Sequence, residues 1–133
     1  MSANLDLVRS IYADWERGDF SRADWADPDI EYVIVGGPTP GEWRGLTSVT
    51  SAWRDVLSAA EDYRVRVDGF REIDGQRVVV LARGSGRGKR SGLQLEEVWT
   101  ENAVLWHIRD GKVTRIVAYW DRDRALADVG LEG

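Results

Sequence analysis

The stretch Leu105-Trp106-His107-Ile108-Arg109-Asp110-Gly111-Lys112-Val113-Thr114-Arg115-Ile116 decides the fold of this chain. Runs rich in β-branched and aromatic residues stand on both sides of Asp110-Gly111, and Asp-Gly is a strong signal for a two-residue turn between antiparallel strands. A second such dipeptide, Asp74-Gly75, stands between two further runs of this kind. We therefore predict an antiparallel meander with strands over residues 63–73, 77–83, 93–108 and 112–120.

Helical patterns dominate the part of the chain before this meander. Apolar residues recur at helical spacing over residues 4–17 and 49–60, and a short helix is predicted over residues 20–26. The β-branched run at residues 30–35 predicts one more strand, and residues 122–129 predict a closing helix with Asp121 as its N-cap. Helices grouped on one face of a curved sheet indicate the α+β class, in a single domain over residues 1–133.

Composition excludes several classes of function. A net charge of −5 disfavours a nucleic-acid partner, because such binding depends on clustered Lys and Arg. The chain has no Cys and one His, so we expect no metal site, and no motif indicates a cofactor. No stretch has the ~18 consecutive apolar residues of a membrane span, and the first residues do not resemble a signal peptide. We expect a cytoplasmic protein. Seven Trp in 133 residues suggest a wide core, a lined cavity or an interface.

Local motifs carry a resemblance to a known family. They are Arg17-Gly18-Asp19-Phe20, Asp27-Pro28-Asp29-Ile30-Glu31-Tyr32, Trp43-Arg44-Gly45 and the closing hairpin over residues 109–121. Their order resembles the nuclear transport factor 2-like superfamily, and most closely its SnoaL-like branch. The resemblance implies a cone-shaped curved antiparallel sheet wrapped around three N-terminal helices, with one internal pocket for a small hydrophobic molecule. It also implies ketosteroid isomerases, polyketide cyclases and non-enzymatic binding domains as relatives.

Apolar residues occupy the positions where these relatives keep their catalytic groups. The resemblance places Ile11 at the tyrosine of the isomerase oxyanion hole and Ile34 at the isomerase base. It places Ala103 and Ala118 at the His and Asp of the cyclases. None of these four side chains can transfer a proton, so any reacting groups must lie elsewhere.

A register without bulges predicts which residues of the last hairpin face the pocket. The two-residue turn sets Ile116 opposite Leu105, which brings Glu101 and His107 to the pocket face. A carboxylate among aromatic rings has a raised pKa, and a histidine titrates near neutral pH, so both are candidate catalytic residues. The alternatives are a salt bridge for the glutamate and a partly exposed strand position for the histidine. The predicted ligand-binding residues are Trp15, Tyr32, Trp53, Trp99 and Trp120.

Three functions remain open at this point. The first is a cofactor-independent isomerase, cyclase, lyase or hydrolase that acts on a hydrophobic small molecule. The second is a non-catalytic ligand-binding domain of the same fold. The third is a dimerisation module, because the same register exposes Val104, Trp106, Val117 and Tyr119 on the other face of the sheet and so predicts a homodimer.

Overall fold

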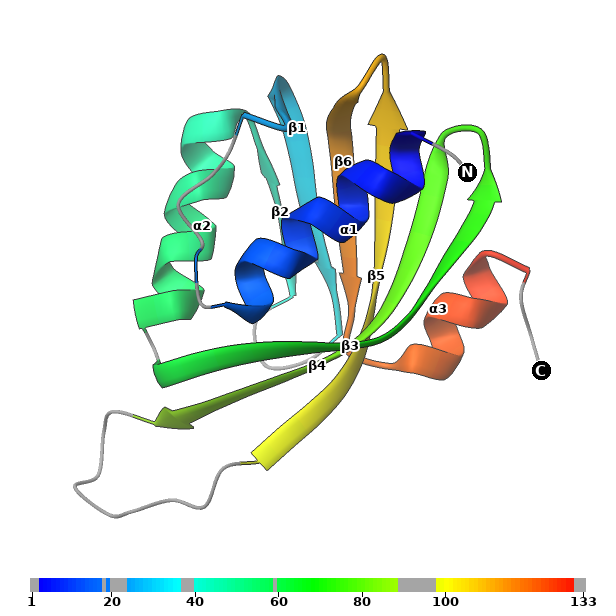
Figure 1. Ribbon diagram of the computed structural model, residues 1–133. Helices are drawn as coiled ribbons and strands as arrows, with labels where there is room; N and C mark the ends of the chain where they lie inside the picture. Colours follow the sequence, from blue (N-terminus) through cyan, green and yellow to red (C-terminus); the bar gives the residue numbers. More distant parts are fainter. Residues whose placement is uncertain are drawn as a thin grey trace.

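A computed structural model describes residues 3–17, 19, 24–36, 40–58, 60–88 and 98–130. The structure has three helices and six strands, and the α+β class is confirmed (Figure 1). In chain order the elements are α1 (Ala3–Glu16), β1 (Ala26–Val35), β2 (Gly41–Arg44), α2 (Leu46–Ser58), β3 (Ala60–Asp74), β4 (Arg77–Gly88), β5 (Val98–Arg109), β6 (Lys112–Tyr119) and α3 (Arg122–Asp128).

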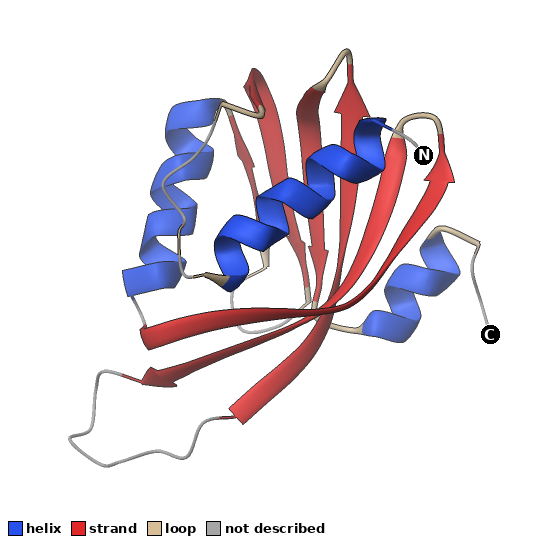
Figure 2. Cartoon of the chain, viewed as in Figure 1, coloured by secondary structure: helices blue, strands red, loops and turns tan. Residues whose placement is uncertain are grey.

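The six strands form one curved sheet with the order β2-β1-β6-β5-β4-β3. The last four strands make the predicted antiparallel meander. The sheet as a whole is mixed, because β1 runs parallel to β6. Helices α1 and α2 cover the concave face, and α3 packs on the opposite face (Figure 2). None of the described helices is long and apolar enough to cross a membrane.

Two features of the N-terminal half were not predicted. Strand β1 already begins at Ala26 and includes Asp27-Pro28-Asp29, which the sequence pattern placed at a helix end. Proline is tolerated there because the pairing of β1 with β6 is irregular between Ala26 and Glu31, so no regular ladder bond is lost. Strand β2 has only four residues and is too short to show a periodic pattern. The predicted helix over residues 20–26 falls partly outside the described residues, and residues 24 and 25 form a turn.

A one-residue bulge sets the register of the last hairpin. Asp110 and Gly111 form the predicted two-residue turn, with positive φ at both residues. Arg109 pairs with Lys112, but His107 pairs with Arg115, so Thr114 is an extra residue on β6. The hydroxyl of Thr114 donates a hydrogen bond of 3.4 Å to the carbonyl oxygen of His107.

The predicted bulge-free register is therefore wrong by one residue. Beyond the bulge, Ile116 pairs with Trp106 instead of Leu105, and Ala118 pairs with Val104 instead of Ala103. Because side chains alternate along a strand, this shift moves every β5 residue of that segment to the other face relative to the prediction.

The corrected faces explain how both sides of the sheet are packed. Val104 and Trp106 belong to the apolar core between the sheet, α1 and α2. Val117 and Tyr119 lie on the other face, in a second core that also includes Ala125 of α3, and are only 6% and 7% exposed. The exposed apolar patch that motivated the homodimer does not exist, so a homodimer stays a prediction without that support.

The closing helix follows its sequence signals. The carboxylate of Asp121 accepts hydrogen bonds from the backbone amides of Asp123 and Arg124, as expected for an N-cap. Gly130 follows the helix with φ of 76°. This cap begins α3 directly after β6, which holds the helix against the outer face of the sheet.

Candidate functional site

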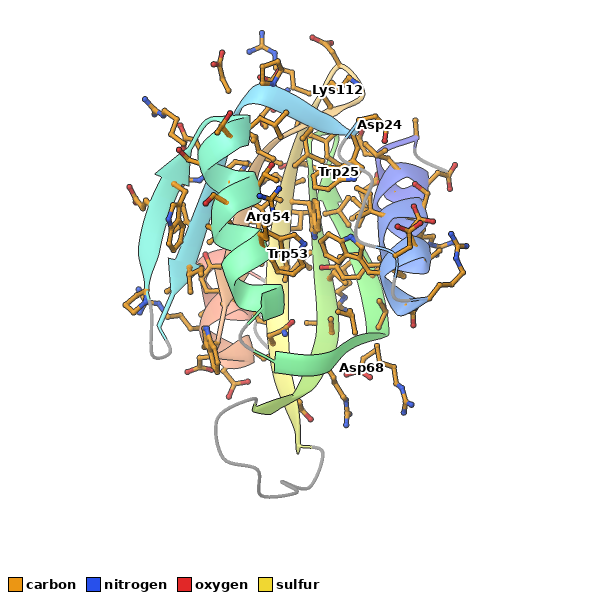
Figure 3. The ribbon with its side chains drawn as sticks, turned by 90° about the vertical axis from the view of Figure 1, so that its left-hand side faces the viewer. Asp24, Trp25, Trp53, Arg54, Asp68 and Lys112 are labelled. Carbon is orange, nitrogen blue, oxygen red and sulfur yellow. The ribbon has the colours of Figure 1, made fainter. Side chains whose placement is uncertain are left out.

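A cavity of about 140 Å³ lies between α1, α2 and the concave face of the sheet. Six aromatic rings contribute to its wall, and none of the described lining residues carries a charge. The lining consists of Tyr12, Trp15, Trp25, Ala26, Ile30, Tyr32, Leu46, Val49, Thr50, Trp53, Val104, Trp106, Ile116 and Ala118. Figure 3 shows Trp25 and Trp53 in the interior between the two helices.

The rings of the cavity wall contact one another in tilted and edge-to-face arrangements. The centroid of Trp15 lies 5.2 Å from that of Trp53 and 5.7 Å from that of Trp106, with planes tilted by 31° and 46°. Tyr12 and Trp25 each meet Trp106 edge to face, at 5.6 Å. Such tilted and edge-to-face contacts are favourable for aromatic quadrupoles, and they fix the shape of the wall.

Hydrogen bonds hold two of these rings in place. The indole Nε1 of Trp106 donates to the hydroxyl oxygen of Tyr12 at 3.2 Å, in a buried position. The amide of Val113 donates to the carbonyl oxygen of Trp25 at 2.8 Å, and the ammonium of Lys112 donates to that of Asp24. The turn before β1 is thereby tied to the start of β6, which places Trp25 over the cavity (Figure 3).

The predicted ligand-binding residues have separate locations. Trp15, Tyr32 and Trp53 line the cavity. The side chain of Trp99 lies outside the described part of the structure. Trp120 is 46% exposed and does not line the cavity. Three other aromatic lining residues were not predicted as ligand-binding residues. Helical spacing indicated that Tyr12 is buried, but the wrong register placed Trp106 on the other face. No sequence signal singled out Trp25.

Glu101 lies on the outer face of the sheet, away from the cavity, which corrects its predicted placement. Its carboxylate is 3.5 Å from Arg83 and 3.6 Å from Arg122. Asp68 completes the group, because its Oδ2 accepts hydrogen bonds from Arg83 at 2.9 Å and Arg122 at 3.0 Å. These contacts lower the pKa of Asp68, mainly through the bond from Arg83. Glu101 therefore forms salt bridges, which was the alternative to its predicted catalytic role.

His107 also lies on the outer face, so its predicted place in the pocket is wrong. It lines an open groove of about 580 Å³ in which most neighbours are charged, including Glu31 and Arg115. Burial lowers the pKa of His107, and the positive charges of Arg115 and Arg77 lower it further. The groove is larger and more open than the cavity, and its lining is mostly charged, whereas the described lining of the cavity is uncharged.

Comparison with known proteins supplies the family. The sequence pattern of the SnoaL-like domain matches residues 8–116. The chain belongs to the SnoaL-like domain family. An uncharacterized protein of Mycobacterium tuberculosis strain H37Rv is 29% identical over 122 residues, which cover 89% of this chain and 88% of that protein.

Solved structures share the fold of this SnoaL-like domain. TerC, co-crystallized with polyporic acid, has a TM-score of 0.74 at 23% identity, over 96% of this chain and 98% of its own. An NTF2-like protein of unknown function from Burkholderia pseudomallei has a TM-score of 0.76 at 21% identity, over 96% and 97% of the two chains. A candidate SnoaL-like polyketide cyclase from Jannaschia sp. CCS1 has a TM-score of 0.72 at 16% identity, over 98% and 92%.

With the corrected register, the hairpin positions that the family resemblance links to catalytic groups are still apolar. Val104, rather than Ala103, now stands opposite Ala118 on the cavity face, and neither side chain can exchange a proton. Ile11 is buried in the core, while its neighbour Tyr12 lines the cavity. Among the described residues, no group of three His, Asp or Glu side chains is placed to hold a metal ion.

Proposed function

We propose that this SnoaL-like domain binds a small, uncharged, ring-containing molecule in the aromatic cavity. The observation that carries the proposal is the lining itself, with six aromatic rings and no charged side chain among its described residues. Small-molecule sites are concave and mostly apolar, with few polar groups. An apolar cavity of roughly 150 Å³ in another protein binds benzene, so a volume of about 140 Å³ matches a ligand with one ring.

Binding is favoured over proton-transfer catalysis. A cofactor-independent isomerase, cyclase, lyase or hydrolase needs an acid or base near its substrate. The described lining provides phenols, indoles and the hydroxyl of Thr50, but no carboxylate and no imidazole. The enzyme alternative draws on Tyr12, whose hydroxyl already accepts a hydrogen bond from Trp106. Structures of the same fold include candidate polyketide cyclases, which keeps this alternative worth testing.

Titration with benzene and toluene, followed by tryptophan fluorescence, tests the binding proposal. We expect saturable binding to the wild-type chain and at least about tenfold weaker binding to Ala118→Leu, because the added side chain fills the space beside Val104. Ala127→Leu makes the same change on the exposed side of α3 and should bind like the wild type. Absence of saturable binding, or equal binding by Ala118→Leu, would contradict the proposal.

A mass-spectrometric assay separates binding from catalysis. Molecules that co-purify with the chain are extracted, identified and incubated again with fresh protein. A binding domain returns them unchanged, whereas the enzyme alternative predicts a product whose formation Tyr12→Phe slows. Formation of such a product would replace the binding proposal by the enzyme alternative.

A further inference from the structure

Each strand of the sheet contributes one polar residue to a single row that crosses the outer face. Residues directly opposite each other in neighbouring strands point to the same face. The strand pairing therefore sets side by side, in sheet order, Arg44, Glu31, Arg115, His107, Arg77 and Asp74. The two carboxylates lie toward the ends of this row, and His107 stands near its centre between two arginines.

The bulge at Thr114 brings Arg115 beside His107. Without the bulge, the two-residue turn would place Thr114 opposite His107. The extra residue moves Arg115 to that place, and Arg77 stands opposite His107 on the other side. Bulges are common beside functional sites, where they redirect a side chain. Neighbouring strands lie about 4.8 Å apart, so the two arginines start roughly 10 Å from each other, close enough for both to reach one ligand over His107.

Both arginines keep hydrogen-bond donors available. Arg77 contacts Asp74 through Nε at 2.9 Å, and Arg115 contacts Glu31 through Nε at 4.0 Å. Among the described residues, none is hydrogen-bonded to a terminal nitrogen of either guanidinium. The two side chains are 35% and 45% exposed, and His107 and Arg115 line the open groove. A ligand from solvent can therefore reach these three side chains.

Positive charge dominates the surroundings of His107. Burial lowers the pKa of His107, the charges of Arg115 on β6 and Arg77 on β4 lower it further, and the charge of Asp74 on β3 raises it. The other charged residues of the groove are Asp27, Asp29, Glu31, Arg109, Asp110 and Lys112. Two arginines thus oppose one carboxylate at the imidazole. An anion bound between the arginines would be attracted by both and would favour the protonated imidazole.

We propose that Arg77, His107 and Arg115 form a binding site for a phosphate group on the outer face of the sheet. A phosphate group presents three acceptor oxygens and a charge of about −1.5 to −2, which match donors from three neighbouring strands. A carboxylate has fewer oxygens and a single charge, so it satisfies fewer of these donors. The ligand is a phosphate ion or a small phosphate monoester. The groove and the aromatic cavity lie on opposite faces, so this inference does not depend on the proposed function.

The single histidine of the chain allows a direct NMR test on the untagged wild type. The pKa of His107 is measured in sodium chloride and, at equal ionic strength, in inorganic phosphate, methyl phosphate or acetate. We expect phosphate to raise the pKa of His107 by about 1 pH unit, and acetate to raise it much less. An equal response to methyl phosphate supports a monoester, whereas a response to inorganic phosphate alone supports the free ion. The same pKa in both phosphates as in chloride would overturn the inference.

Variants test the role of the two arginines. Arg77→Gln and Arg115→Gln each remove one guanidinium and should weaken phosphate binding at least about tenfold, the effect of a charge-assisted hydrogen bond. The phosphate concentration that gives half of the change in the His107 signal measures binding at constant pH. Arg54→Gln makes the same change at an exposed arginine of α2 and should bind like the wild type (Figure 3). Wild-type phosphate binding by both Arg77→Gln and Arg115→Gln would show that the inference is wrong.

Discussion

The two faces of the sheet are both covered by helices, but different kinds of side chain pack on them. The concave side carries large rings from α1, the turn before β1, β1, α2 and β5, and a cavity remains between them. The outer face carries smaller side chains such as Val79, Ala103, Leu105 and Val117, with α3 packed on them through Ala125. Charged groups surround that second core, from the ion pairs of Asp68 to the groove at His107.

The two sides differ in the kind of side chain that packs there. Most side chains of the outer core are aliphatic, whereas rings in tilted and edge-to-face contacts form the wall of the cavity on the concave side. Both faces come from the same strands, because alternate residues point to opposite sides. One sheet can thus have a close-packed, stabilising side and a hollow side suited to a ligand.

The largest expected effect comes from removing the ring at the centre of the hollow face. Trp106 is fully buried and contacts Tyr12, Trp15 and Trp25. Trp106→Ala should lower the free energy of unfolding by about 3–5 kcal/mol, the usual cost of deleting a buried ring. Urea denaturation measures this change. Trp120→Ala, at an exposed tryptophan, should change stability by less than about 0.5 kcal/mol. Similar losses in both variants would contradict the assignment of faces.

A smaller effect should separate the close-packed face from the hollow face. Ala103 is fully buried in the outer core, and Ala118 lines the cavity. Ala103→Val should cost about 1–3 kcal/mol through overpacking, whereas Ala118→Val has space and should be nearly neutral. The thermal unfolding midpoints of the two variants are compared with that of the wild type. Both variants carry the same Ala→Val change, so a difference between them reflects the two sites. A larger loss of stability in Ala118→Val than in Ala103→Val would instead support the bulge-free register of β5 and β6.

The smallest expected effect concerns pH and the outer groove. Burial and neighbouring arginines lower the folded-state pKa of His107 below its ordinary value of 6.5. The unfolded chain then binds more protons just below pH 6.5, so this contribution to stability is complete above that pH and is lost as pH falls toward the folded pKa. Between pH 7.5 and 5.5, the thermal midpoint should fall more for the wild type than for His107→Gln. Parallel curves would show that His107 does not cause the loss.

Much of the fold follows from local sequence signals. The turn at Asp110-Gly111, the N-cap Asp121 and the helical spacing of Tyr12 and Trp15 each reflect interactions within a few residues, so they could be predicted. Part of the cavity could be predicted as well, since Trp15, Tyr32 and Trp53 all line it. Strand β2 was missed because four residues are too few to show a pattern.

The sequence by itself determined the α+β class, the meander of the last four strands, the family and the aromatic character of the core. Tertiary structure decided which face each β5 side chain occupies. The bulge at Thr114 depends on pairing between strands and on the packing of both faces, which no local pattern encodes. That single extra residue moved Glu101 and His107 to the outer face. It also brought Val104 and Trp106 to the cavity.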